Sequence, residues 1–280
     1  MKTVLLVAKK GKSEAASLAV KIRERHPELE LLADEKLAEV VGWPVPDPDA
    51  LARLSLVVVL GGDGTLIYAS RLLAGRPVPI LGVNLGSLGF MTEIPQPELF
   101  PALEAALEGR FQVDRRMKLR CQLWREGRVI LEEEVLNDVV INKGVLARIA
   151  DHEMSIDGEF VTSYKSDGVI VSTPTGSTAY ALSAGGPIVH PSTDAVIVAP
   201  ICPHALTQRA IVVPSDRAIS IALRTEVVDV FLTVDGQTGI PLQAGDRLDV
   251  VRSPNVVLLI RNPDIGYFQI LRQKLRWGER

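Results

Sequence analysis

Val57-Val58-Val59-Leu60-Gly61-Gly62-Asp63-Gly64-Thr65 is the stretch of sequence that decides the fold. The unbroken aliphatic run over residues 56–60 predicts a buried strand, and the glycines after it predict a tight turn into a helix over about residues 65–73. A strand that is apolar on both faces is typical of a parallel sheet covered by helices. Open sheets of this kind bind ligands at the carboxyl ends of their strands, where this turn lies.

The segments on either side of this stretch continue the alternation of strand and helix. Further buried strands are predicted over residues 3–8, 29–32 and 79–83, and helices over residues 13–25 and 98–107. This alternation predicts an amino-terminal, Rossmann-like α/β domain that spans residues 1–115 and carries the glycine turn.

After Phe111 the pattern changes to short β-rich runs separated by Pro, Gly, Asp and Asn. Such runs predict a β-sandwich over residues 116–262. They are residues 118–125, 128–135, 155–157, 160–164, 196–199, 210–213, 219–223, 228–234, 247–251 and 256–260. The segment 263–280 is expected to contain a final helix with Phe268, Leu271 and Leu275 on its apolar side.

The overall composition narrows the classes of partner. A formal net charge of −3 provides no general attraction to nucleic acid or to an anionic membrane. No apolar stretch approaches the roughly 20 residues that a membrane span needs, and the apolar run near Met1 is too short for a signal peptide. Cys121 and Cys202 are too far apart to suggest a disulfide framework. We therefore expect a cytoplasmic protein with neither nucleic acid nor membrane as a partner.

The glycine turn has the residues of a phosphoryl-transfer site. Its glycines open the backbone N–H groups to phosphate oxygens, so Gly61, Gly62, Gly64 and Thr65 are predicted to form the phosphate-donor loop. The start of the next helix favours a charged carboxylate at Asp63, which suits a general base that accepts a hydroxyl proton. A helix-capping aspartate is the structural alternative. A contact between Asp63 and magnesium is the competing chemistry.

A second polar region covers residues 165–187, where a short strand runs into a turn rich in hydroxyl groups. Ser177 or Thr178 is expected to cap a short helix that the following glycines end. Turn chemistry explains the proline, the glycines and one cap. Because several hydroxyls are then left over, we interpret the turn as a binding site for polar ligand oxygens.

Other polar residues have weaker patterns. Asn137-Asp138 interrupts an apolar run, which indicates either a bulge or turn or a pair that faces a ligand. The four histidines have no spacing that suggests a metal site or a catalytic triad, and they are interpreted as structural. Asp47, Asp49 and the run of glutamates at 132–134 are interpreted as solvated charges, and no metal ligand is assigned.

Taken in order, these motifs closely resemble those of the NAD kinase family. The resemblance runs through the glycine–aspartate turn, residues 84–90, Asn137-Asp138, residues 166–187, Asp235-Gly236-Gln237 and residues 267–277. It implies phosphorylation of the 2′-hydroxyl of the adenosine ribose of NAD, an α/β domain followed by a β-sandwich, and a final helix that returns to the first domain.

The resemblance also implies site residues and partners. Asp63 would be the proton acceptor, and the residues that bind NAD would be Asp63, Gly64, Asn137, Asp138, Arg148, Lys165, Asp167, Thr178, Ala179, Tyr180, Ala181, Leu182, Ser183 and Gln237. The phosphate donor would be ATP or polyphosphate with a divalent metal cation such as Mg²⁺, and the protein would form a homodimer or homotetramer. The family usually has Glu where this chain has Asp138, so the contact of this shorter carboxylate could be longer or water-mediated.

Three alternatives remain open at this point. A diacylglycerol-type lipid kinase shares the glycine–aspartate turn but does not require the hydroxyl-rich block. A non-enzymatic NADP(H)-binding sensor would keep the fold but has no need of a base at Asp63. A dehydrogenase is disfavoured, because no Gly-x-Gly-x-x-Gly follows a predicted strand.

Overall fold

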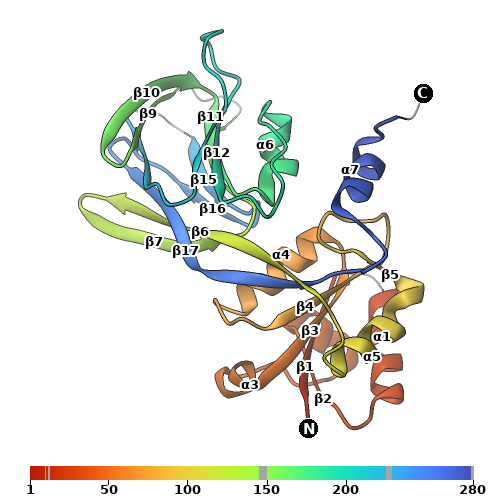
Figure 1. The fold of residues 1–280 in the computed structure, drawn as a ribbon. Helices are drawn as coiled ribbons and strands as arrows, with labels where there is room; N and C mark the ends of the chain where they lie inside the picture. Colours follow the sequence, from red (N-terminus) through yellow and green to blue (C-terminus); the bar gives the residue numbers. More distant parts are fainter. Residues whose placement is uncertain (10, 12, 145–149, 225–228, 279–280) are drawn as a thin grey trace. The chain divides into compact units, whose positions relative to one another are not determined.

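The computed structural model describes residues 1–9, 11, 13–144, 150–224 and 229–278 (Figure 1). The chain divides into two compact units. The first unit consists of Met1–Arg115 and Val257–Arg280, and the second consists of Arg116–Val256.

The first unit is a mixed α/β structure. Its elements are β1 (Thr3–Ala8), α1 (Ser13–Arg25), β2 (Glu30–Ala33), α2 (Glu35–Val41), α3 (Pro48–Arg53), β3 (Leu54–Gly61), α4 (Asp63–Leu72), β4 (Pro79–Asn84), β5 (Ile94–Pro95), the 3-10 helix η1 (Gln96–Glu98), α5 (Leu99–Leu107) and α7 (Tyr267–Leu275). Strands β4, β3, β1 and β2 pair in that order in a parallel sheet, with β5 beside β4.

Helices cover both faces of this sheet. On one face, Val4, Leu6 and Val58 share a buried core with residues of α1 and α5. Gly82 lies on the other face, where a Cβ atom would be only 3.1 Å from Leu66 of α4. Because the strands are buried on both sides, their sequences are unbroken aliphatic runs. The predicted α/β domain is therefore confirmed.

Two short helices, α2 and α3, were not predicted. Each is preceded by an N-cap aspartate whose side chain accepts a hydrogen bond from a backbone N–H in the first turn: Asp34 from Lys36 and Asp47 from Ala50. Asp47 is exposed, as expected for a solvated charge, and its carboxylate in addition caps α3. Burial raises the pKa of Asp34, although hydrogen bonds from Ala8 and Lys36 oppose the rise.

The second unit is built almost entirely of strands. Its elements are β6 (Val113–Arg125), β7 (Arg128–Val135), β8 (Asp138–Lys143), β9 (Ala150–Ile156), β10 (Glu159–Ser166), β11 (Gly168–Ser172), the 3-10 helix η2 (Gly176–Thr178), α6 (Tyr180–Ser183), β12 (Ala195–Ile201), β13 (Ile211–Pro214), β14 (Ile219–Leu223), β15 (Val230–Val234), β16 (Thr238–Pro241) and β17 (Arg247–Ile260).

These strands form two sheets that share one core. A six-stranded antiparallel sheet has the order β13-β12-β11-β8-β15-β16, and the second sheet contains β10, β9, β14, β17, β6 and β7. Leu119 and Leu248 of one sheet and Val171 of the other belong to the same buried cluster. A separate cluster on the other face of the six-stranded sheet includes Ile170 and Ala181, so the segment that contains α6 covers this face. The predicted β-sandwich is confirmed.

The structure corrects two details near the carboxyl end of the chain. The two strands predicted over residues 247–251 and 256–260 are one strand, β17, which continues through Pro254; its last residues pair with β4 in the first unit. The buried side of α7 carries Ile270 and Leu271, whereas Phe268 is 63% exposed. The prediction for Phe268 was wrong, because the buried face of α7 is centred on Ile270 and Leu271 and Phe268 lies outside it.

Glu134 was also misinterpreted as a solvated charge. Its carboxylate accepts hydrogen bonds from Lys118, Ser253 and Asn255, all within the second unit. Burial alone would raise the pKa of Glu134, but these hydrogen bonds outweigh it and lower the pKa overall. His152 is fully buried in the same unit, and burial lowers its pKa to about 4, so it is neutral at physiological pH.

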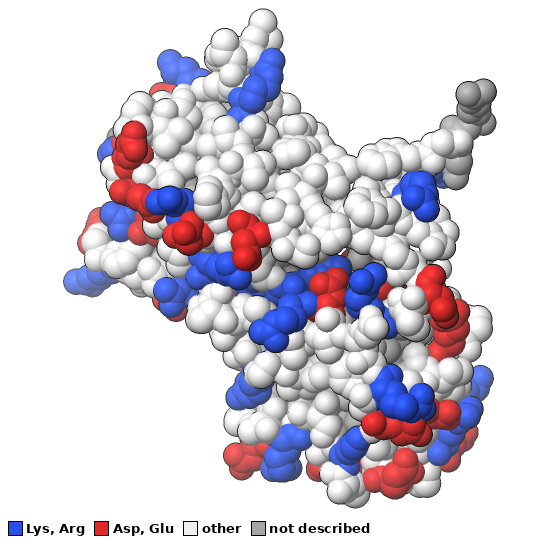
Figure 2. Space-filling model, viewed as in Figure 1, with Lys and Arg blue, Asp and Glu red and all other residues white. Residues whose placement is uncertain are grey.

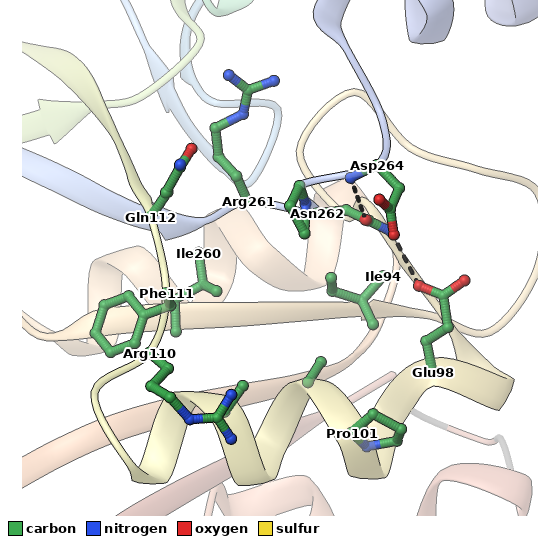
Figure 3. Close-up of a pocket in the computed structure, with 13 residues that line it drawn as sticks. Ile94, Glu98, Pro101, Arg110, Phe111, Gln112, Ile260, Arg261, Asn262 and Asp264 are labelled. Carbon is green, nitrogen blue, oxygen red and sulfur yellow. Dashed lines mark hydrogen bonds between the residues drawn. The ribbon is translucent and has the colours of Figure 1, made fainter.

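Asn262 fixes the turn that connects β17 to α7 in the first unit. It is 2% exposed, its Oδ1 accepts from the N–H of Asp264 at 3.0 Å, and its Nδ2 donates to Glu98 at 3.0 Å (Figure 3). The residue lines a mainly apolar cavity of about 500 Å³ beside α5. None of the predicted site residues lines this cavity.

Substitution of Asn262 by alanine is expected to destabilise the protein. The change removes two side-chain hydrogen bonds, one from the N–H of Asp264 and one to Glu98. Each such bond contributes about 0.5–1.5 kcal/mol to stability, so the two together contribute about 1–3 kcal/mol. Urea unfolding of the variant should show a free energy of unfolding lower by this amount. Gln112→Ala is the matched control, because Gln112 lines the same cavity but is exposed. Equal stabilities of the two variants would contradict the role of Asn262.

Figure 2 shows acidic and basic side chains interspersed on the visible face of the first unit. Within the described residues, the structure has no helix with the length and apolar character that a membrane crossing demands.

Candidate active site

The glycine turn lies at the carboxyl end of β3, between two strands of the parallel sheet. Gly61 ends the strand and pairs with Asn84 at the end of β4. Gly62 is extended and precedes the first residue of α4, Asp63. A Cβ atom on Gly61 would lie 2.4 Å from Oγ1 of Thr65, so only glycine fits where the turn folds back on itself. Gly62 and Gly64 have open space where a Cβ atom would lie, at the edge where such sheets bind ligands.

The carboxylate of Asp63 is held by the loop that follows β4. The backbone N–H groups of Phe90, Met91 and Thr92 donate to it at 2.8, 3.0 and 3.0 Å. The hydroxyl of Thr92 adds a fourth hydrogen bond at 3.1 Å. Asp63 is therefore more than a helix-capping residue: it ties the glycine turn to a loop about thirty residues away in the chain.

Asn84 organises this loop from within. Its Oδ1 accepts from the N–H of Gly86 at 2.6 Å, and its Nδ2 donates to the carbonyl of Ser87 at 2.6 Å and to Oγ1 of Thr92 at 3.1 Å. Asn84 lies in a motif that resembles the family's, but no role was predicted for it, and Thr92 was not predicted at all. A polar residue at the end of a buried strand was the available indication for Asn84, and nothing comparable marked Thr92.

In the second unit, Asp235 organises the other polar region. It lies in the turn between β15 and β16, and its carboxylate accepts from the backbone N–H groups of Leu136, Asn137 and Asp138 at 2.9, 2.7 and 3.1 Å. Burial raises the pKa of Asp235, while these three hydrogen bonds oppose the rise. The Asp-Gly turn after a strand could have indicated Asp235. In this motif, however, a role was predicted only for Gln237.

The turn after β11 packs against the same segment. The N–H of Thr173 donates to the carbonyl of Asn137 at 2.9 Å, and its hydroxyl donates to the carbonyl of Leu136 at 2.6 Å. Gly176 lies so close that a Cβ atom would be 2.2 Å from the carbonyl oxygen of Asn137. The structure therefore brings together Asn137, Asp138 and the start of the hydroxyl-rich turn at one end of the central strands β8 and β11.

Several hydroxyls of this turn form hydrogen bonds with backbone carbonyls. Ser172 donates to the carbonyls of Asn137 and Thr173, and Ser177 donates to the carbonyls of Pro174 and Val189. Neither Ser177 nor Thr178 caps a helix: Thr178 donates to the carbonyl of Thr175, and Ala179 precedes α6. The prediction of a cap was wrong, and the surplus of hydroxyls is largely explained by the shape of the turn.

Asn137 and Asp138 keep free binding capacity. Oδ1 of Asn137 is buried, and no described residue donates a hydrogen bond to it. Asp138 is 5% exposed, and burial together with the nearby charge of Asp235 raises its pKa to about 7. Asp138 is therefore partly protonated near neutral pH, so that its carboxyl group can donate as well as accept a hydrogen bond.

This shift predicts a dependence of stability on pH. In the unfolded chain Asp138 loses its proton near its ordinary pKa of 3.8, but in the folded protein it does so near 7. Between these values the folded state binds more protons, so the free energy of unfolding falls as the pH rises, by at most roughly 4 kcal/mol. Asp138→Asn should remove this loss and be more stable relative to wild type at pH 8 than at pH 5.

Urea unfolding at the two pH values measures this difference. Asp216→Asn, at an exposed position of the same unit, is the control and should show little change between them. A difference between wild type and Asp138→Asn that is the same at both pH values would contradict the prediction.

The remaining predicted residues are spread over the second unit. Asp167 forms an ion pair with Lys143 at 3.1 Å. It lies just before β11, at the opposite end of that strand from Ser172. Lys165, two residues earlier in the chain, is exposed. Burial and the charges near its phenol, including those of Asp167 and Asp138, raise the pKa of Tyr180.

Tyr180, Ser183 and Gln237 are exposed, Thr178, Ala179 and Leu182 are half-buried, and Ala181 is buried in the outer cluster. Arg148 lies outside the described residues.

One unit has a glycine turn and a hydrogen-bonded carboxylate, Asp63, at the end of a parallel sheet strand, and the other has a polar site on a β-sandwich. This fold and these sites are those of a two-domain, nucleotide-binding phosphotransferase. The model of the ATP-NAD kinase N-terminal domain matches residues 46–111, and that of the C-terminal domain matches residues 136–262. These matches cover more than half of the chain, which therefore belongs to the NAD kinase family.

Relatives and solved structures agree with this assignment. The chain is 54% identical to the NAD kinase of Geotalea daltonii over 83% of this chain and 82% of that protein. It is 43% identical to the NAD kinase of Koribacter versatilis over the full length of both. Yeast NADH kinase in complex with NADH superposes with a TM-score of 0.91 at 25% identity, covering 100% of this chain and 89% of that one. An NAD kinase from Archaeoglobus fulgidus in complex with ATP gives 0.78 at 25% identity, covering 99% of both.

Proposed function

We propose that this protein transfers a phosphoryl group from ATP to the 2′-hydroxyl of the adenosine ribose of NAD and so forms NADP. Membership of the NAD kinase family supports NAD as the acceptor. Two solved relatives are complexes with NADH and with ATP. The observation that carries the proposal is the Asp63 carboxylate, held rigidly in a glycine turn where phosphate oxygens can reach the backbone.

In this proposal Asp63 is the general base. Phosphoryl transfer depends mainly on positioning and on neutralising charge, so a preorganised carboxylate that accepts the hydroxyl proton is of direct use. The N–H groups around Gly61, Gly62 and Gly64 and the hydroxyl of Thr65 would hold the phosphate donor.

The second unit would supply the site for NAD. The free Oδ1 of Asn137 and the partly protonated carboxyl group of Asp138 are suited to hydroxyl and amide groups of the dinucleotide. The exposed Tyr180, Ser183 and Gln237 would contact the same ligand. The other proposed contacts are Asp63, Gly64, Arg148, Lys165, Asp167, Thr178, Ala179, Ala181 and Leu182.

The divalent cation is proposed to arrive with the phosphate donor. Among the described residues, no three His, Cys, Asp or Glu side chains are grouped so that they could hold a metal ion. Mg²⁺ in kinases is bound mostly by substrate phosphates and water with one or two carboxylates, so an all-protein cage is not required. The metal would neutralise charge on the donor phosphates.

The proposal also covers the roles of the domains and the assembly of the protein. Residues 1–115 would form the donor domain and residues 116–262 the NAD-binding domain, with 263–280 packing on the first. The protein would act in the cytoplasm as a homodimer or homotetramer, and polyphosphate is a second possible donor.

The test uses purified protein with NAD, MgCl₂ and either ATP or polyphosphate, and NADP is detected with an NADP-specific dehydrogenase. Formation of NADP that depends on ATP is the expected result. Parallel reactions with diacylglycerol test the lipid-kinase alternative. Binding of NAD without any NADP formed with either donor would contradict the proposal and favour the sensor.

A further inference from the structure

The hydroxyl of Thr92 is fixed in one orientation. Thr92 is fully buried, and its Oγ1 lies 3.1 Å from Oδ1 of Asp63 and 3.1 Å from Nδ2 of Asn84. The amide nitrogen of Asn84 can only donate, and a carboxylate oxygen of Asp63 accepts. The proton of Thr92 must therefore point to Asp63, and Asn84 directs it there.

The hydrogen bonds on Asp63 are unevenly divided between its two oxygens. Oδ1 accepts from the N–H groups of Met91 and Thr92 and from the hydroxyl of Thr92. Oδ2 accepts only from the N–H of Phe90 among the described residues. A carboxylate has about four acceptor positions, two on each oxygen. Oδ1 is thus saturated, while Oδ2 keeps room for a substrate hydroxyl.

Close packing prevents the carboxylate from turning. A Cβ atom on Gly89 would lie 2.2 Å from Oδ1 of Asp63 and 2.2 Å from Oγ1 of Thr92. The backbone of Gly89 therefore packs closely against both groups. Rotation of the carboxylate out of this orientation would break the hydrogen bonds to both oxygens of Asp63.

We propose that Thr92, oriented by Asn84, is a positioning residue for the reaction: it holds Oδ1 of Asp63 so that Oδ2 is the oxygen that accepts the proton. This inference rests on the proposed role of Asp63 as general base. Thr92 acts on the base and not on the substrates, so its loss should lower kcat and leave KM for NAD and ATP nearly unchanged. Small errors in the position of a reacting group are costly, and we expect a fall in kcat of roughly ten- to a hundredfold.

Three substitutions separate positioning from packing. Thr92→Val keeps the shape of the side chain but removes the hydroxyl, whereas Thr92→Ser keeps the hydroxyl and removes a methyl group. Thr3→Val is the matched control, because Thr3 is a buried threonine of the same unit that donates to a carboxylate, Glu30, at 2.6 Å. Steady-state kcat and both KM values are measured for each variant with the full-length enzyme, and thermal unfolding verifies folding.

The expected result is a low kcat for Thr92→Val, recovery to within a few-fold of wild type for Thr92→Ser, and normal kcat for Thr3→Val. A Thr92→Val enzyme that is folded and fully active overturns the inference, as does a Thr92→Ser enzyme as slow as Thr92→Val. An effect confined to KM does so as well. Asp63→Asn is measured in the same series: if that variant keeps near-full turnover, the proposed base itself fails, which is a distinct outcome.

Discussion

Replacement of Asp63 by asparagine is expected to lower kcat for NADP formation by about 10²–10⁴-fold, the usual contribution of a positioned general base. An amide cannot accept the proton of the attacking hydroxyl. Steady-state kinetics with NAD and ATP measure the loss, and the dissociation constant for NAD measured by calorimetry shows whether substrate binding survives. We expect binding in the second unit to be largely retained.

The structure adds a second consequence of this substitution. Four hydrogen bonds end on the two oxygens of Asp63, so an amide must turn its NH₂ group toward at least one of the donors of Phe90, Met91 or Thr92. The loop after β4 should therefore loosen as well, and the melting temperature should fall by a few degrees.

Asp49→Asn provides the control for this experiment. Asp49 also lies in the first turn of a helix in the first unit, but it is exposed. This variant should keep wild-type turnover. If Asp63→Asn were as active as Asp49→Asn, Asp63 would have no role as base.

Substitution of Gly176 by alanine is expected to abolish most NAD binding. The added Cβ would meet the carbonyl oxygen of Asn137 at 2.2 Å and the hydroxyl oxygen of Ser172 at 2.6 Å. The nearest of these atoms belongs to the backbone, so the segment of Asn137 and Asp138 must move away from the turn. Overpacking of this kind costs about 1–3 kcal/mol or more in stability. A displaced Asn137 should also weaken NAD binding by at least roughly tenfold.

Gly239→Ala is the matched substitution in the same unit. Gly239 lies on β16 with open space where a Cβ would be, and it is exposed. Calorimetric titration with NAD and urea unfolding should show near wild-type values for this variant. Equal NAD affinity of Gly176→Ala and wild type would show that the close approach of the turn to Asn137 does not shape the site.

The elements of the first unit could be predicted where burial is uniform. Strand β3 is buried on both faces of the sheet, so its sequence is an unbroken aliphatic run that needs no knowledge of its neighbours. Helices α2 and α3 were missed because each has only about two turns. Such helices depend on caps such as Asp34 and Asp47 and on tertiary packing more than on periodicity.

Some residues of the candidate site could be predicted from the sequence, and others could not. Asp63 and the pair Asn137-Asp138 were recognisable because polar residues interrupt apolar runs at those points. Thr92 and Asp235 were not assigned roles, since nothing in the local sequence marks Thr92 and the Asp-Gly turn at Asp235 does not show which groups its carboxylate binds. Their partners lie far away: Asp63 is 29 residues from Thr92, and Leu136 is 99 residues from Asp235.

The sequence by itself determined the two kinds of domain, the glycine turn with its carboxylate and the resemblance to NAD kinases, because these follow from local pattern and composition. Only the tertiary structure decided which polar groups remain free. Strand pairing brings distant loops together, and the resulting hydrogen bonds engage Ser172, Thr173 and Ser177 with the backbone and leave Oδ2 of Asp63 and Oδ1 of Asn137 with free capacity among the described residues. A buried polar group must find a partner, and which partner it finds depends on the fold rather than on its neighbours in the chain.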